Sequence, residues 1–131
     1  MGLASGFHGR RLPPIDELLD TVMIGERILK IRVEQEQKDL AIRVEYPRGS
    51  GRIWMCAYEI DWPEGTKRME AAGADAIQAL QCALEMIGTE LYTSSYHRNG
   101  EVGYWGDWMG YGFPVPNNIR DLLIGDDKKY F

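Results

Sequence analysis

Only a few side chains in this sequence could carry acid–base, nucleophilic or metal chemistry. His97 is the one histidine in the part of the chain that we predict to fold, and His8 lies near the N-terminus. To act as a base or metal ligand, His97 would need a carboxylate nearby, for which Asp107 and Glu101 are close in sequence. We favour a surface or helix-end histidine that makes one hydrogen bond, and we predict no metal site.

The remaining reactive side chains are better explained by structure. Asp61 and Glu64 flank a Pro-Gly turn, where carboxylates more often cap and solvate the turn than perform glycosidase-type acid–base work. Cys56 and Cys82 have no cationic neighbour or helix N-terminus that would lower a thiol pKa. The nucleotide-binding pattern GxxxxGK[ST] is missing from the sequence. We therefore predict no catalytic residues and no cofactor, which argues against an enzyme.

The segment YWGDWMGYGFPVP, residues 104–116, is the best candidate for a functional surface. Its glycines permit sharp bends, and its aromatic rings supply large flat surfaces. One interpretation is a plug, in which Tyr111, Phe113 and a tryptophan fold back over a sheet. The other is a binding surface, in which Trp105 and Trp108 stay partly exposed as anchors for a protein or a small ligand. The predicted binding residues are Tyr104, Trp105, Trp108 and Tyr111.

The two halves of this segment are expected to differ. GYGFPVP is expected to be structural. YWGDWM is expected to be the exposed half, because Asp107 interrupts its apolar residues.

Short alternating segments predict the sheet that must position this loop. ERILKIRVE, LAIRVEY and IWMCAYEI read as strands, and the charged stretch TKRME reads as an edge strand. In the first strand the residues Leu29, Ile31 and Val33 share one face. The opposite face carries Ile28, Lys30 and Arg32, so we expect it to be partly solvated.

GADAIQALQCALEMIGTELY predicts one long helix from Asp75 to Tyr92, with Asp75 as its N-cap and Gln78 in a box-like position. Its apolar stripe comprises Ala76, Ile77, Leu80, Ala83, Leu84, Ile87 and Leu91. A short final helix is expected to begin after Asn117 or Asn118 and to end at Gly125.

These elements predict an α+β fold: a four-stranded, mostly antiparallel sheet with one long helix on one face, an aromatic and Gly-rich loop, and a short C-terminal helix. Residues 1–22 read as an N-terminal tail with a short helix at PPIDELLD. Residues 23–127 read as a single domain, and residues 128–131 as a C-terminal tail.

Composition narrows the classes of partner. The chain has 131 residues and a net charge of −5, whereas nucleic-acid binders are usually basic. Two cysteines are too few for a disulfide framework. No apolar run approaches the roughly 20 residues of a membrane span, and the N-terminus lacks the pattern of a signal peptide. We predict a cytoplasmic protein with neither a nucleic-acid nor a membrane partner.

Three stretches carry a resemblance to a known family: YEIDWPEG (Tyr58 to Gly65), DAIQALQCALEMIGTELY (Asp75 to Tyr92) and YGFPVPNNIRDLLIGDD (Tyr111 to Asp127). Together they resemble a family of small uncharacterised bacterial proteins classed as a domain of unknown function. The resemblance covers roughly Met23 to Asp127 and implies no activity, cofactor or catalytic residue. The sequence before Met23 departs from the family, so a translation start at Met23 is a hypothesis. A more distant likeness, to antitoxins that pair three strands with a helix, rests on topology alone.

Two functions remain open. The first is a non-catalytic interaction module, neutralising or regulatory, that binds an unknown protein or a second copy through the 104–113 loop or a sheet surface. The alternative is a small-molecule-binding protein or minor enzyme with a pocket between the helix and the aromatic loop. A deep apolar cleft containing His97, Asp61 or Glu64 would favour the second, and a flat exposed tryptophan patch would favour the first.

Overall fold

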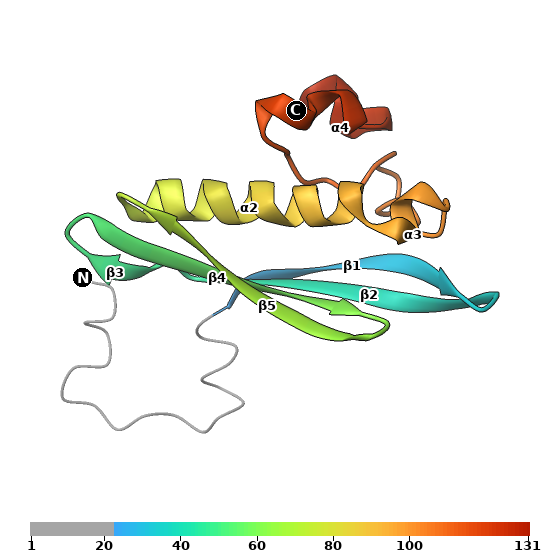
Figure 1. Ribbon diagram of the computed structural model, residues 1–131, viewed down its shortest axis with the longest axis horizontal. Helices are drawn as coiled ribbons and strands as arrows, with labels where there is room; N and C mark the ends of the chain where they lie inside the picture. Colours follow the sequence, from blue (N-terminus) through green and yellow to red (C-terminus); the bar gives the residue numbers. More distant parts are fainter. Residues whose placement is uncertain (1–22) are drawn as a thin grey trace.

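A computed structural model describes residues 23–131, so the short helix predicted at PPIDELLD lies outside the described residues. The strands are β1 (Met23–Val33), β2 (Glu36–Glu45), β3 (Arg48–Ser50), β4 (Ile53–Trp62) and β5 (Gly65–Gly73). The helices are α2 (Ala76–Thr93), α3 (Ser95–Arg98), the 3-10 helix η2 (Asn117–Leu122) and α4 (Gly125–Tyr130). The sheet forms one layer, α2 lies across it, and the C-terminal segment with α4 lies on the far side of α2 (Figure 1).

The predicted antiparallel sheet is confirmed. Its long strands follow the order β1-β2-β4-β5, and β3 is a short fifth strand that pairs with β4. The β1–β2 turn is tighter than the polar break suggested, because Glu34 and Gln35 both have positive φ, at 52° and 67°, as two-residue hairpin turns require. The part of EQEQKD that follows therefore extends β2.

The core lies between the sheet and α2. Leu29 and Ile31 of β1 are buried in it, as their alternation predicts. Further core residues from the sheet are Leu40, Ile42, Val44, Cys56, Tyr58, Ile60 and Ala71.

Charged side chains bridge the strands on the opposite face of the sheet. Arg43 of β2 binds both carboxylate oxygens of Asp61, at 2.6 and 2.9 Å, and its Nε donates to Glu59 at 3.1 Å. Arg68 of β5 pairs with Glu45 of β2. The Arg43 contacts join the neighbouring strands β2 and β4, and the Arg68–Glu45 pair spans β4, so opposite charges support the sheet and keep this face polar, as expected.

The predicted long helix is confirmed as α2. The Asp75 side chain accepts from the Gln78 amide at 2.8 Å, which is the N-cap that the sequence indicates. The predicted stripe is wrong at Ile77, which is 68% exposed. The buried side of α2 instead starts from Ala79, because a Cβ on Gly73 of β5 would lie only 2.3 Å from the Ala79 nitrogen. This close approach fixes the rotation of α2 on the sheet.

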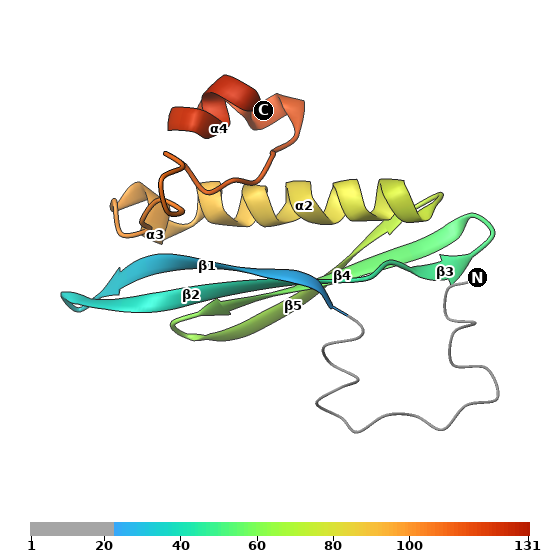
Figure 2. The ribbon, with the colours of Figure 1, turned by 180° about the vertical axis from the view of Figure 1, so that it is seen from behind.

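The chain then crosses the outer side of α2 (Figure 2). A Cβ on Gly88 would lie 1.9 Å from the Pro114 carbonyl oxygen, so the crossing occurs at backbone contact distance. The prediction that Gly125 ends a helix is wrong, because Gly125 begins α4 and this helix takes in most of the predicted polar tail. Gly125 has φ of +55° and packs against the Met109 carbonyl, which places the start of α4 on the aromatic loop. None of the helices among residues 23–131 is long and apolar enough to cross a membrane.

Candidate functional site

The aromatic segment forms a tight hairpin above α2. The Trp105 amide donates to the Gly110 carbonyl at 3.0 Å, and the Trp108 amide donates to the Trp105 carbonyl at 2.9 Å. Gly106 has φ of +54°, a conformation that favours glycine. The 104–110 hairpin therefore has a backbone fixed by its own hydrogen bonds.

Asp127 of α4 anchors this hairpin through its side chain. Its fully buried carboxylate accepts hydrogen bonds from the indole Nε1 of Trp108 at 2.6 Å and from the Tyr92 hydroxyl. It also accepts from the amides of Tyr111 and Gly112, both at 2.9 Å. Buried carboxylates are costly unless their oxygens are satisfied, and here four donors surround one side chain. Asp127 thus ties α2, the loop and α4 together.

The four predicted binding residues divide into two pairs. Tyr104 is 49% exposed and Trp105 is 39% exposed. Trp108 is half-buried against the rings of Tyr130 and Phe131, while Tyr111 is buried with 2% exposure. The segment therefore contains both exposed aromatic residues, as a binding surface would, and a buried one, as a plug would. The assignment of these residues to binding stays a prediction, and the exposed rings are those of the first pair.

Arg27 of β1 joins this segment to the sheet. Its Nη1 donates to the Gly112 carbonyl at 2.7 Å. The guanidinium carbon lies 3.7 Å from the centre of the Trp105 ring and 4.8 Å from that of Phe113. Burial lowers the pKa of Arg27, opposed by the charge of Asp127, although a guanidinium stays protonated in proteins. Within residues 23–131, Arg27 forms no ion pair with a carboxylate.

An apolar pocket of about 420 Å³ opens beside Arg27, between α2, β1 and the aromatic loop. Its apolar lining includes Ile42, Val44, Leu80, Leu84, Phe113 and Phe131. This volume lies within the range of about 300–1,000 Å³ typical of small-molecule sites. His97, Asp61 and Glu64 are not among its lining residues, so the pocket lacks the acid–base groups that we considered.

His97 lies in α3 and makes one side-chain hydrogen bond, as predicted. Its partner is the Tyr111 hydroxyl, 2.5 Å from Nδ1, rather than Asp107 or Glu101. Burial lowers the pKa of His97 and raises that of Tyr111, which favours a neutral imidazole beside a protonated phenol. A hollow of about 310 Å³ adjoins this pair, with Tyr104 on its wall.

The other candidate side chains are engaged separately. Arg43 lowers the pKa of Asp61 by hydrogen bonding its carboxylate, and Glu64 accepts from the Tyr96 hydroxyl at 2.8 Å. Burial raises the pKa of Cys56 to about 11, which makes its thiol a poor nucleophile. Each of these groups therefore has a structural role, and they do not share a site.

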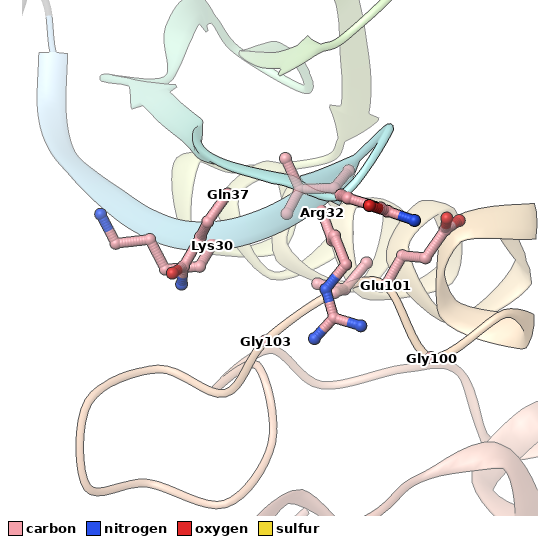
Figure 3. Close-up of a pocket in the computed structure, with 9 residues that line it drawn as sticks. Lys30, Arg32, Gln37, Gly100, Glu101 and Gly103 are labelled. Carbon is pink, nitrogen blue, oxygen red and sulfur yellow. The ribbon is translucent and has the colours of Figure 1, made fainter.

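A second pocket, polar and about 290 Å³ in volume, lies at the edge of β1. There the segment after α3 pairs with the strand, through the Arg32 amide and the Glu101 carbonyl at 2.8 Å. Figure 3 shows Arg32 reaching toward the loop that carries Gly100 and Gly103, while Lys30 points the other way. Lys30 is paired with Asp39 at 2.5 Å. This pocket is separate from the apolar one.

Sequence reasoning missed the two charged residues that organise the site. Arg27 could have been found from the sequence. It precedes Leu29 by two residues and Ile31 by four, so strand alternation places it on the core face of β1. Asp127 gave no such signal, since its partners are brought together by tertiary structure alone.

Comparison with known proteins yielded a family but no activity. No curated protein and no solved structure matches the chain. A family model described as "Domain of unknown function (DUF6968)" matches residues 25–115, from β1 to the segment that crosses α2. This agrees with the resemblance to a family without assigned activity. Because the match spans more than half of the sequence, the chain belongs to the family of the domain of unknown function DUF6968.

Proposed function

We propose that this domain is a non-catalytic protein-interaction module that contacts its partner through the 104–110 hairpin. The observation that carries the proposal is the state of Trp105, a residue that is 39% exposed although its backbone is hydrogen-bonded and Arg27 stacks on its ring. A tryptophan that is already ordered on the surface loses little conformational entropy when it enters a partner's pocket. Such side chains dominate the binding energy of protein interfaces.

The surroundings of Trp105 support this proposal. Tyr104 and Met109 on the same hairpin are exposed, and so is Tyr130 of α4. Tyr130 packs against Trp108, with 5.5 Å between ring centres, which connects α4 to the hairpin. Exposed apolar side chains gathered on one part of a surface are typical of interaction sites.

The reactive groups support a non-catalytic role. A general base and its partner must lie within hydrogen-bonding reach of the same substrate. Here Asp61 is neutralised by Arg43 on the open face of the sheet, whereas His97 is bonded to Tyr111 beneath the hairpin.

Affinity capture of the tagged full-length protein from its native cells tests the proposal. Wild type is compared with Trp105→Ala and with Ile53→Ala, a control that removes an equally apolar side chain, 76% exposed, from the start of β4. We expect one partner to be retained by wild type and by the control, and to be depleted by about tenfold or more with Trp105→Ala, the effect of losing a central anchor.

Circular dichroism confirms that all three proteins are folded before capture. Equal recovery from wild type and Trp105→Ala would contradict the proposal. If the retained species is the chain itself, the partner is a second copy, and gel filtration should show the same dependence on Trp105.

The apolar pocket favours a second candidate, a small-molecule-binding protein. Its lining residues come from α2, the sheet and the aromatic loop. A pocket between the helix and this loop is the feature that we associated with the alternative function. Thermal unfolding in the presence of a neutral apolar probe, octanamide, tests this function. A midpoint that rises and saturates with probe concentration supports it, and an unchanged midpoint contradicts it.

A further inference from the structure

We propose that the pocket between α2 and the aromatic loop binds a small molecule with an apolar body and one carboxylate, and that Arg27 receives the carboxylate. The inference rests on the second candidate function and adds the chemical class of the ligand. It follows from one cation placed at the wall of a mostly apolar pocket.

The apolar lining defines the body of the ligand. Ile42 and Val44 of β2 are core residues that reach the pocket, and Phe113 is buried beside them. Leu80 and Leu84 contribute from α2, where both are only partly buried. A bound ligand would therefore remove its own apolar surface and that of the pocket lining from water. This burial is the main source of affinity for an apolar body.

Arg27 defines the charge of the ligand. Its guanidinium carries five N–H donors, of which the described residues engage one, through the Gly112 carbonyl at 2.7 Å. Trp105 and Phe113 fix the plane of the group. A partly desolvated cation without an ionic partner is costly, and a carboxylate is the ligand group that relieves that cost with paired hydrogen bonds.

Among residues 23–131, two carboxylates belong to the surroundings of Arg27 or of the pocket, but neither replaces a ligand. The Asp127 charge acts on Arg27, yet its oxygens already accept from Tyr92, Trp108 and two backbone amides. Glu26 lines the pocket, and its Oε2 is 3.4 Å from Arg43. The Asp127 charge weakens anion binding through space, while the remaining Arg27 donors have no hydrogen-bond partner in the described part of the chain.

Calorimetric titration of the full-length protein with two matched probes, octanoate and octanamide, tests the inference. The probes share an alkyl chain and differ in charge. We expect both to bind with one site per chain, and octanoate to bind about tenfold or more tightly, since a charge-assisted hydrogen bond is worth more than a neutral one.

Three variants locate the site. Arg27→Gln should bring octanoate to the affinity of octanamide, and Leu84→Trp should abolish binding of both by filling the pocket. Arg32→Gln is the matched control, because it removes an exposed arginine from the same strand without touching the apolar pocket. It should leave the octanoate affinity unchanged.

The outcomes separate the inference from the function on which it rests. If wild type binds octanamide as tightly as octanoate, the pocket function stands and the carboxylate assignment is overturned. If neither probe binds, both are overturned. The wild-type comparison decides these points even if Arg27→Gln does not fold.

Discussion

The Arg27 guanidinium carbon lies 3.7 Å from the centre of the Trp105 ring, although the two residues belong to an edge of the sheet and to a loop after the long helix. A cation over an indole face stabilises the pair by about 0.5–2 kcal/mol, depending on exposure. The contact holds an exposed ring in place and leaves Arg27 at the wall of the apolar pocket. The proposed protein surface and the proposed ligand pocket therefore meet at one side chain.

Replacing Asp127 with alanine should be the most damaging change in the C-terminal segment. It leaves the Trp108 indole, the Tyr92 hydroxyl and two backbone amides without their acceptor. We expect the free energy of unfolding to fall by about 3 kcal/mol or more, as measured by urea denaturation. Asp121→Ala, an exposed carboxylate of η2, should change it by less than about 0.5 kcal/mol. Equal effects of the two variants would show that Asp127 does not anchor the hairpin.

Trp105 and Trp108 should differ in their effect on stability. Trp108→Ala removes a hydrogen bond to Asp127 and ring contacts with Tyr130 and Phe131, so we expect a loss of about 3 kcal/mol. Trp105→Ala removes a partly exposed ring and its stacking on Arg27, so we expect about 1 kcal/mol. Thermal denaturation of the two single variants measures the difference. If Trp105→Ala lowers stability more than Trp108→Ala does, the Trp105 ring contributes to the core and does not serve as an exposed anchor.

Alanine at Gly88 should destabilise the protein even though alanine is the better helix former. The added Cβ would lie 1.9 Å from the Pro114 carbonyl oxygen, so the crossing segment must move away from α2. We expect a loss of about 1–3 kcal/mol from the steric conflict, which exceeds the gain of about 1 kcal/mol in helix propensity.

The matched control for that substitution is Gly25→Ala, since a Cβ at Gly25 meets no atom of residues 23–131 within 4 Å. Chemical denaturation compares the two variants. If Gly88→Ala is neutral or stabilising, the segment does not cross α2 at backbone contact distance.

His97 should make stability depend on pH near neutrality. Burial, assisted by the charge of Arg98, lowers its pKa in the folded state below the ordinary value of about 6.5. The unfolded chain therefore binds the proton first as the pH falls, so this contribution to stability is complete above about pH 6.5 and is lost toward the lower folded pKa.

The unfolding midpoint should accordingly drop between pH 7.5 and pH 5.5 in wild type, and less steeply in His97→Gln. Glutamine keeps an acceptor for the Tyr111 hydroxyl and has no proton to gain. Parallel pH profiles for the two proteins would mean that His97 is not held neutral by its surroundings.

Local sequence patterns predicted most of the fold because the elements satisfy local rules. Leu29 and Ile31 alternate into the core, and Asp75 caps α2 as its position indicates. The error at Ile77 arose because propensity and periodicity do not set the rotation of a helix, which here depends on the approach of Gly73 to Ala79.

The candidate site was predicted only in part, for a similar reason. The aromatic composition of the loop indicated a surface, and Tyr104 and Trp105 are exposed. Trp108 and Tyr111 both donate to Asp127, which lies far along the chain from the hairpin and to which the sequence patterns gave no role. Contacts between distant segments leave no periodic trace in a sequence, so such a buried carboxylate is found only from the structure.

Photo-crosslinking inside native cells can show whether the hairpin touches a partner, because it reports contact at a chosen side chain. Benzoylphenylalanine replaces Tyr104 on the hairpin in one protein and Ile53 at the start of β4 in the other, both exposed positions. We expect a discrete covalent adduct from position 104 and none from position 53. No adduct at position 104, or the same adduct at both positions, would contradict a partner surface on the aromatic hairpin.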